Sequence, residues 1–419
     1  MKRLLLAMTL SLPFVITSCQ GNDGISSTNE ENSSLNNERK DIVLSRTEQQ
    51  LLDENVKFAF SFFNKMNEQE TEKANWLISP LSASIALSMT ANGADDTSLN
   101  QIQNVLGFKG FQMEEINSYY NRIIGELMAL DNTTKFNLAN SVWLHNDFNV
   151  YDSFVNINKE KYDAEVTSLD LSSPLALETI NDWSAKQTED LIPVIIDKLP
   201  EDMIFCILNS LYFKGGWESE FKESATVDEL FTCADGKQSK VKMMRQKKVF
   251  WSCVNDNFKL AEFPYGNSAF SMVVLLPNEE STLEESLQAF TAEYWTESMQ
   301  MKGKELDVHF PRFELKYEAD LINVMKSLGI TDIFDSESAN LSKMTPDDIY
   351  VNLLKQSAYI KTDEKGTEAA ATTIVGGNIT MAPPTTFEKI DFNMNRPFAF
   401  LIKEKSTGII LFMGKVTEL

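Results

Sequence analysis

Residues 364–375 read EKGTEAAATTIV, and residues 376–384 continue as GGNITMAPP. The first stretch consists mostly of small residues and shows no helical spacing of apolar side chains. The second contains two glycines and two prolines, which interrupt regular structure. A loop this long inside a compact domain is usually either functional or disordered. The segment from Lys361 to Asp391 is therefore the part of the chain that fits an ordinary domain least.

The first half of this segment is compatible with two conformations. In a strand, alternate residues share one face. That face would carry Thr367, Ala369, Ala371, Thr373 and Val375. Side chains of this size could enter a narrow slot over a hydrophobic core, so the segment could exist as an exposed loop or as a buried strand. Composition alone favours the plainer alternative, a flexible surface loop.

The rest of the chain mixes helical and strand patterns without regular alternation. Helices are expected at 52–66, from Ser79-Pro80 to Asn92-Gly93, at 97–106, and near 112–130, 174–189 and 318–328. Strands are expected at 136–144, 204–213, 270–276, 308–313, 398–402 and 409–413. The last two are joined through Ser406-Thr407-Gly408, a hairpin signal. Together these patterns predict an α+β domain with no internal repeat.

Composition excludes several function classes. The 419 residues carry a net charge of −23, which argues against a general nucleic-acid binder and against adsorption to anionic membranes. Only two histidines are present, His145 and His309, and the four cysteines form no CxxC site. No Gly-x-Ser-x-Gly elbow is found. We therefore expect neither an enzyme nor a metal site.

The N-terminus has the layout of an export signal. Lys2 and Arg3 precede an apolar run from Leu4 to Ile16, which is too short to span a bilayer as a stable helix. The run ends Ile16-Thr17-Ser18-Cys19, which resembles a bacterial lipobox with Cys19 as the acylated residue. Residues 1–18 are thus predicted to be a lipoprotein signal peptide, residues 19–45 a flexible tether and residues 46–419 the folded domain. An ordinary secretory signal with a chance cysteine, or a buried apolar segment, is the alternative.

A lipobox implies export and a lipid anchor in a bacterial envelope membrane, on the periplasmic or cell-surface side of an outer membrane. Release into the medium is a second outcome that the sequence leaves open. Apart from this anchor, no membrane contact is expected.

Four motifs occur in register across the predicted folded domain. Residues 75–82 read NWLISPLS, with Gly93-Ala94 and Thr97 following; residues 209–217 read NSLYFKGGW; residues 364–372 read EKGTEAAAT; and NRPF at 395–398 precedes FMGKV at 412–416. In this order they resemble the signatures of the serpin family. The resemblance implies three β-sheets, eight or nine helices and an exposed reactive-centre loop.

The resemblance also implies a mechanism. The loop is offered to a target endopeptidase, which cleaves one bond and forms a covalent acyl-enzyme. The freed end of the loop then inserts into the main sheet as a new strand and traps the protease. A monomeric inhibitor that needs no cofactor is expected. A non-inhibitory binding protein of the same fold is the alternative.

The hinge of the loop distinguishes these two cases. It comprises Glu364, Gly366, Thr367, Glu368, Ala369, Ala370, Ala371 and Thr372. Its inward-facing residues are small, and no proline precedes Pro383, so strand insertion is favoured. Family counting from Gly366 places the reactive bond at Thr380–Met381, with a register uncertain within 379–384.

The loop also limits the choice of target. No Lys or Arg lies between Lys365 and Lys389, which disfavours trypsin-like enzymes because their specificity pocket needs a cation. Elastase-like or subtilisin-like serine proteases, or some cysteine proteases, are favoured instead.

Several residues outside the loop match gating positions of the family. Glu364 and Arg312 are expected to form an ion pair at the top of the main sheet, with Trp217 nearby. Ser79, Ser82 and Asn209 are expected lower down, with Gln356 where many members have a histidine. Cys233 and Cys253 could pair in an oxidising compartment, but free thiols are equally compatible with the sequence.

Overall fold

The computed structural model describes residues 37–71, 74–200, 203–298, 301–367 and 387–419. The contacts group Asn37–Leu419 into one unit. The predicted signal peptide, residues 19–36 of the predicted tether and hinge residues 368–372 lie outside the described residues. The same holds for Cys19 and for the predicted reactive bond at Thr380–Met381.

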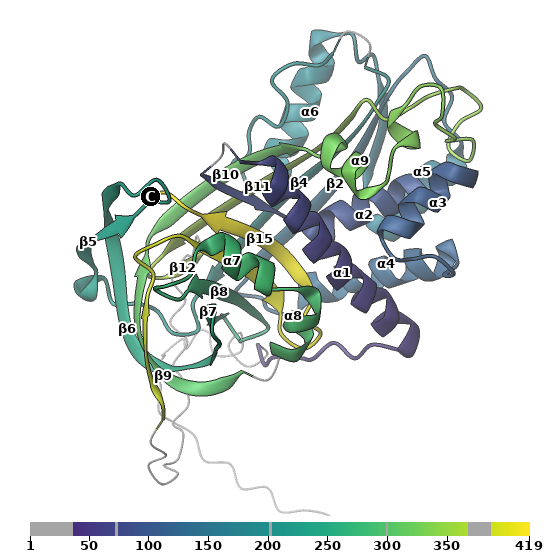
Figure 1. The fold of residues 1–419 in the computed structure, drawn as a ribbon. Helices are drawn as coiled ribbons and strands as arrows, with labels where there is room; N and C mark the ends of the chain where they lie inside the picture. The colour runs from purple at the N-terminus through teal and green to yellow at the C-terminus, as the bar shows by residue number, and fades with distance from the viewer. Residues whose placement is uncertain (1–36, 72–73, 201–202, 299–300, 368–386) are drawn as a thin grey trace, which may run out of the picture. The chain divides into compact units, whose positions relative to one another are not determined.

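The described residues contain nine α-helices and two single-turn 3₁₀ helices (Figure 1). The helices are α1 (Arg46–Gln69), α2 (Pro80–Ala91), α3 (Asp96–Val105), α4 (Met113–Ala129), α5 (Asp152–Tyr162), α6 (Pro174–Gln187), α7 (Leu283–Ala289), α8 (Ala292–Ser298) and α9 (Ile322–Leu328), with η1 at Glu223–Ala225 and η2 at Asp332–Phe334. The number of helices agrees with the eight or nine expected.

The strands form two continuous hydrogen-bonded ladders. The six-stranded sheet has the order β10 (Phe313–Asp320), β11 (Leu353–Asp363), β12 (Gly366–Thr367), β4 (Phe205–Gly216), β2 (Lys135–His145) and β3 (Glu165–Leu169). The nine-stranded sheet has the order β1 (Asn75–Ile78), β15 (Ile410–Val416), β14 (Phe398–Glu404), β8 (Phe270–Pro277), β7 (Phe258–Tyr265), β6 (Gln238–Val254), β9 (Lys302–Pro311) and β13 (Lys389–Asn393), with β5 (Val227–Thr232) beside β6.

The larger sheet divides at β6. Only the last four residues of β6, Trp251–Val254, pair with β7, whereas most of the strand pairs with β9 or β5. The parts on either side of this junction correspond to two separate sheets. The three-sheet α+β fold is therefore present, with two of its sheets joined through β6.

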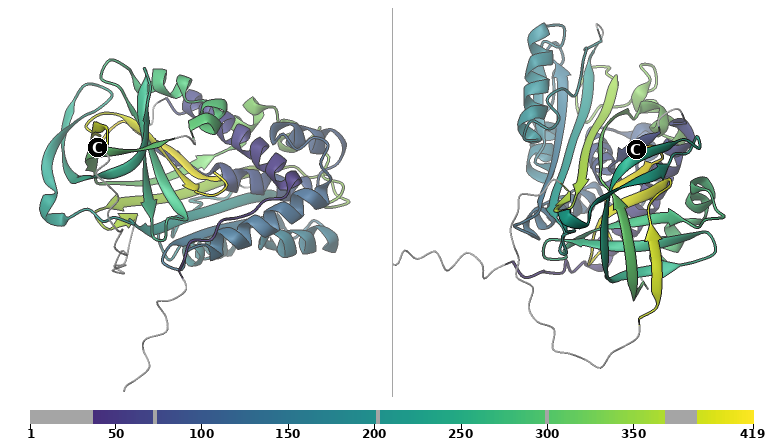
Figure 2. Two further views of the ribbon diagram at one scale, coloured as in Figure 1. Left: turned by 90° about the horizontal axis from the view of Figure 1, so that it is seen from below. Right: turned by 90° about the vertical axis from the view of Figure 1, so that its left-hand side faces the viewer.

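The six-stranded sheet is covered on both faces. Figure 2 shows α6 on one face, with the nine-stranded sheet and the other large helices on the opposite side. Along β4, Cys206 and Leu208 belong to the small core under α6, whereas Phe205, Ile207 and Leu211 belong to the main core. Because neighbouring residues of a strand point to opposite faces, burial on both sides explains why β4 is apolar at nearly every position.

Two expected elements have different bounds. The helix expected near 318–328 begins at Ile322, since residues up to Asp320 continue β10. The run expected as one strand over 308–313 is interrupted at Arg312, and the two halves join different sheets. The hairpin signal at Ser406-Thr407-Gly408 does connect β14 to β15.

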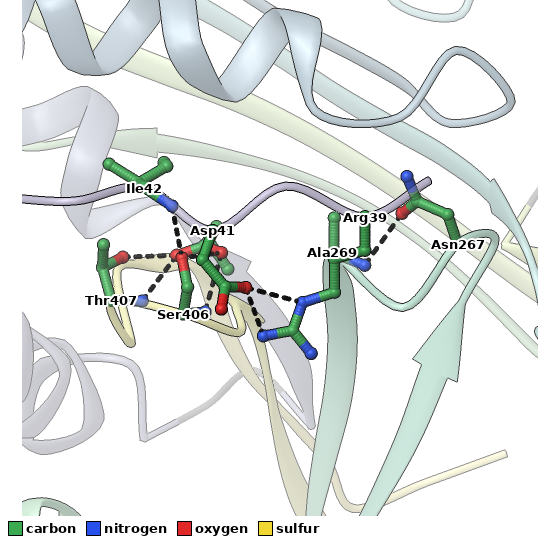
Figure 3. Close-up of polar contacts among 8 residues, drawn as sticks. Arg39, Asp41, Ile42, Asn267, Ala269, Ser406 and Thr407 are labelled. Carbon is green, nitrogen blue, oxygen red and sulfur yellow. Dashed lines mark hydrogen bonds and ion pairs between the residues drawn. The ribbon is translucent and has the colours of Figure 1, made fainter. Parts of the chain in front are cut away.

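The predicted tether ends earlier than expected, because residues 37–45 pack on the folded body (Figure 3). Ile42 is buried, and its backbone N–H donates to Ser406 Oγ at 2.9 Å in the turn between β14 and β15. The carbonyl of Val43 accepts a hydrogen bond from Arg122 of α4 at 2.7 Å. We call residues 37–45 the N-terminal strap. The polar composition up to Asp41 concealed this packing, because the apolar residues that anchor the segment, Ile42 and Leu44, come only near its end.

Candidate functional site

The hinge of the loop enters the six-stranded sheet between two strands that are paired further along. β11 and β4 run parallel and pair from Leu353↔Cys206 to Tyr359↔Tyr212. Beyond this point they part, and Gly366 and Thr367 form β12 between them, antiparallel to both. Gly366 and Thr367 of the hinge thus already occupy a strand position in the sheet.

Gly366 is required by the close approach of the backbones. Its φ of +146° lies in the region that favours glycine. A Cβ atom there would lie 2.1 Å from the carbonyl oxygen of Gly215. Any side chain at Gly366 would therefore push β12 away from β4.

Thr367 is fully buried next to Gly366, with 0% exposure. Its hydroxyl lies 2.7 Å from the hydroxyl of Tyr265. Burial raises the pKa of Tyr265, so this phenol stays protonated and can share the hydrogen bond. Thr367 therefore points into the body of the protein, as the alternation along the hinge predicts.

The ion pair expected at the base of the loop is formed. Arg312 donates to Glu364 Oε1 from Nε at 2.9 Å and from Nη2 at 2.5 Å, and the hydroxyl of Thr226 donates to the same oxygen. Burial raises the pKa of Glu364, but the hydrogen bonds from Arg312 and Thr226 outweigh it and lower the pKa. Glu364 is 3% exposed and Arg312 remains partly open to solvent, so the bridge closes the sheet at its rim.

Trp217 holds the chain on both sides of Glu364, in the turn just before β12. Its ring stacks on Tyr265, with centroids 4.5 Å apart and an interplanar angle of 10°. Its Nε1 donates to the carbonyl of Asp363 at 2.9 Å, and its backbone N–H donates to the carbonyl of Lys365 at 2.7 Å. These two bonds fix the turn that leads from β11 into β12.

A second polar cluster lies under the same two strands, about 20 Å from the hinge if each strand residue adds 3.3 Å. Gln356 of β11 is 2% exposed. Its Oε1 accepts from Ser79 N at 2.7 Å, and its Nε2 donates to Ser79 O at 3.0 Å. The Ser79 hydroxyl in turn caps α2 by accepting from Ser82 N at 3.2 Å. One amide therefore ties β11 to the start of the buried helix α2.

Asn209 stands opposite Gln356 on β4 and donates to Asn140 of β2 at 2.5 Å. Among the described residues, Asn209 Oδ1, Asn140 Nδ2 and Ser82 Oγ are buried without a hydrogen-bond partner. Buried polar atoms of this kind cost free energy when they remain unpaired. They lie beneath the pair of strands that would have to separate to admit a longer insert.

The structure brings the predicted residues together in two groups. Glu364, Gly366, Thr367, Arg312 and Trp217 surround the hinge. Ser79, Ser82, Asn209 and Gln356 lie lower in the sheet.

Sequence reasoning missed Tyr265, Thr226 and Asn140, which complete the two groups. The only local signal for any of them was the turn that follows Tyr265 at Gly266. Their partners lie 69 to 138 residues away in the chain, so no short-range pattern identifies them.

Other candidate chemistry is limited in the described part of the chain. Cys206, Cys233 and Cys253 are free thiols there. No cluster of three or more His, Cys, Asp or Glu side chains could hold a metal ion among the same residues. None of the helices described there is both long and apolar enough for a membrane crossing.

Comparison with known proteins places this geometry in context. The family model described as "Serpin (serine protease inhibitor)" matches residues 53–419. The leukocyte elastase inhibitor of Equus caballus is 32% identical over 384 residues, which cover 88% of this chain and 100% of that protein. The human leukocyte elastase inhibitor is 31% identical over 384 residues, with the same coverage.

Two solved structures have the same fold. The native state of tengpin, a thermophilic serpin, matches with a TM-score of 0.80 and 28% identity, over 91% of this chain and 96% of that one. Human thyroxine-binding globulin complexed with thyroxine matches with a TM-score of 0.80 and 26% identity, over 89% of this chain and 99% of that one. The family model, these relatives and the position of the hinge agree: the chain belongs to the serpin family.

Proposed function

We propose that this serpin is a suicide-substrate inhibitor of serine endopeptidases, with some cysteine proteases as further targets. The observation that carries the proposal is β12. Gly366 and Thr367 already occupy the gap between β11 and β4, and the sequence continues from Thr367 with small residues at alternate positions. An insert of this type could extend along the gap as far as β11 and β4 separate.

The proposed reaction begins as ordinary proteolysis. The serine of the protease attacks the carbonyl carbon of Thr380, the C–N bond to Met381 breaks, and the proton leaves with the new amino group. The carbonyl of Thr380 stays bound to the protease as an ester. Insertion of residues 368–380 then carries the protease away before water can hydrolyse that ester.

The two polar clusters have distinct parts in this proposal. Glu364 and Arg312 hold the rim of the sheet beside β12 before cleavage. Gln356 and Asn209 lie where β11 and β4 must part, and the unpaired Oδ1 of Asn209 and Nδ2 of Asn140 would gain partners from an inserted strand. Relief of these buried polar groups adds to the free energy that drives insertion.

Elastase-like targets are proposed ahead of trypsin-like ones. Residues 366–388 contain no Lys or Arg, and Ile379, Thr380 and Met381 suit pockets of small to medium size. Relatives named leukocyte elastase inhibitor support the same choice. Subtilisin-like enzymes share this preference for uncharged residues and are included.

A denaturing gel tests the proposal directly. The full chain without its signal peptide is mixed with elastase-type, subtilisin-type and trypsin-type proteases, and each mixture is boiled in detergent. A heavier covalent band with the first two classes is the expected result. Complete cleavage with no covalent band for any protease would contradict inhibition.

A non-inhibitory binding protein is the second candidate. The similarity to thyroxine-binding globulin supports it, because a chain of this fold is there described in complex with a small molecule. This chain has an open hollow of about 510 Å³ between α1, α8 and the β14–β15 turn. The same gel separates the two candidates, because a protein that only binds would leave cut chain without an adduct.

We also propose that the protein is exported and lipid-anchored through Cys19 to a bacterial envelope membrane. The Ile16-Thr17-Ser18-Cys19 motif after an apolar run supports this location. Expression in a bacterium fed with labelled palmitate would label the wild type but not Cys19→Ala. Equal labelling of both proteins would rule out Cys19 as the acylation site.

A further inference from the structure

The outer face of the β6–β9–β13 sheet carries apolar side chains near the point where the chain returns from the loop. Trp251 and Val249 of β6 are 51% and 40% exposed, and Phe387, just before β13, is 42% exposed. Exposed aromatic residues that lie together mark interaction surfaces more often than scattered ones do. We call Val249, Trp251 and Phe387 the Trp251 patch.

Val249 and Phe387 approach each other over Gly303 of β9, and Trp251 lies beside them on the same face. Trp251 pairs with Gly303, and the register of β13 on β9 puts Phe387 on the other side of the same residue. A Cβ atom on Gly303 would lie 3.4 Å from Val249 Cγ1 and 3.7 Å from Phe387 Cε1. The missing side chain thus lets apolar groups from two strands adjoin across the third.

The position of Phe387 is set by its neighbours. The backbone N–H of Glu305 donates to the carbonyl of Glu388 at 2.9 Å, and Lys304 Nζ lies 3.0 Å from the Glu388 carboxylate. These contacts hold the chain against β9 right next to Phe387. The Trp251 patch is therefore a built surface and not a free end of the chain.

The charged residues beside the patch neutralise one another. Lys247 lies 3.6 Å from Glu305 and 3.9 Å from Asp307, and Lys389 lies 3.8 Å from Glu305. The adjoining polar surface therefore presents no strong field of one sign. A partner would gain most from burying the apolar part, which argues against a polyanion and for a protein surface.

The short stretch of chain between the predicted reactive bond and the patch indicates that this partner is the target protease. Phe387 follows Met381, at the predicted reactive bond, by only six positions in the chain. Six residues span at most about 20 Å. A globular endopeptidase of about 200 residues has a radius of gyration of about 16 Å, so its body reaches roughly 20 Å from its centre. An enzyme attacking this bond therefore cannot keep its surface far from the Trp251 patch.

We propose that the Trp251 patch is a second contact site for the target protease, separate from the loop. This rests on the proposed inhibitory function and adds a specificity surface to it. Protease–inhibitor interfaces bury about 800 Å² on each partner, so contact beyond the loop itself is expected. The patch would act on the encounter and leave strand insertion unchanged, because β6, β9 and β13 belong to the other sheet.

The test uses an elastase-type protease whose catalytic serine is replaced by alanine, so that binding is measured without cleavage. Trp251→Ala and Phe387→Ala are expected to weaken binding of the otherwise intact inhibitor at least tenfold. Leu175→Ala on α6 is the matched control, because Leu175 is 69% exposed and lies outside this sheet (Figure 1). Its affinity is expected to stay within twofold of the wild type. Melting temperatures show whether each variant is folded.

Active elastase then separates this proposal from the proposed function. The patch variants should form the covalent complex more slowly than the wild type but with the same number of inhibitor molecules consumed per protease. Absence of the covalent band in the wild type would contradict inhibition, while the binding assay would still measure the patch.

Three outcomes would overturn the patch proposal. The first is equal affinity of the wild type and the patch variants for the inactive protease, and the second is no measurable binding by the wild type. The third is a dimer of the wild type that Trp251→Ala dissociates, because a second copy would then be the occupant.

Discussion

Among single residues, Glu364 is the buried acid at the base of the loop, with 3% exposure. Its carboxylate receives Arg312 and Thr226, and its backbone carbonyl accepts from Phe221 N at 2.8 Å. A carboxylate that accepts several hydrogen bonds is stabilised in its ionised form. Glu364 therefore links protonation to the stability of the rim.

The lowered pKa of Glu364 predicts a specific pH dependence. A group whose pKa is lower in the folded state stabilises that state above its unfolded pKa, and the contribution is lost as the pH falls through the folded pKa. The ordinary pKa of a glutamate carboxyl is 4.5, so the loss is expected below about pH 4.5. Glu364→Gln should lower the stability by about 1–2 kcal/mol at pH 7 and flatten this acid limb.

Melting temperatures measured from pH 7 to pH 3 provide the check. Glu314→Gln is the matched control, because Glu314 pairs with Lys361 at 3.3 Å on the neighbouring strand but is half exposed. It should change stability by less than about 0.5 kcal/mol. Identical acid limbs for Glu364→Gln and the wild type would contradict the assigned role.

Among the structural elements, β12 and the N-terminal strap both occupy positions that their own sequences do not predict. β12 has only two residues, yet it pairs with strands on both sides. The strap has no regular structure, yet it touches α4 and the β14–β15 turn. In both cases the receiving surface determines the conformation of the short segment.

Thr367→Arg should convert the inhibitor into a substrate. The side chain at 367 is fully buried between β11 and β4, so a cation there would have to leave water without a partner. Loop insertion should become slower than hydrolysis of the acyl-enzyme, so the covalent band should be at least tenfold weaker. Glu368→Arg is the control, because in an inserted strand the alternation of side chains would turn position 368 to the opposite face. Equal covalent complex from both variants would refute the inward insertion of residue 367.

Ile42→Ala should loosen the N-terminal strap. Ile42 is 5% exposed, whereas its neighbour Val43 is 79% exposed. Truncating a buried isoleucine to alanine costs about 2–5 kcal/mol, with the lower end expected at the edge of a domain. The melting temperature should fall by about 2–5 °C. Val43→Ala should leave it within about 1 °C, and a similar fall in both variants would show that the strap does not stabilise the body through Ile42.

For the whole molecule, β11 and β4 part beyond Tyr359 and Tyr212, so an extension of β12 between them would give the smaller sheet six full strands. In the described residues, β12 covers Gly366–Thr367, and a longer strand would fit there only if β11 and β4 separated further. A fold that can gain a strand is held away from its lowest free energy by kinetics. In the proposed mechanism, the uncleaved connection through the loop prevents this gain.

Cleavage of the loop between Gly376 and Pro384 should therefore stabilise the protein. About ten additional ladder hydrogen bonds at about 1 kcal/mol each correspond to a rise in melting temperature on the order of 10 °C. The measurement compares the intact and the clipped chain by calorimetry. Clipped Thr367→Arg is the control and should gain much less. A clipped wild type that melts no higher than the intact chain would exclude strand insertion as the energy source.

Short-range patterns predicted six of the nine α-helices and six of the fifteen strands in the described residues, and the side of the strand on which Thr367 lies. Helix α2 follows from Ser79-Pro80 at its start and Asn92-Gly93 at its end, and the β14–β15 hairpin follows from its turn residues. The small residues at alternate hinge positions predicted an inward-facing Thr367, which the structure has. These features are local, because caps, turns and side-chain alternation act over a few residues.

The remaining features depend on contacts between distant parts of the chain. Tyr265 meets Thr367 across 102 residues, and Thr226 meets Glu364 across 138. The polar composition up to Asp41 predicts a flexible tether. Only the surface that receives Ile42 makes the strap part of the fold. Strand register and packing bring these groups together, and no local preference encodes a pairing whose partners are a hundred residues apart.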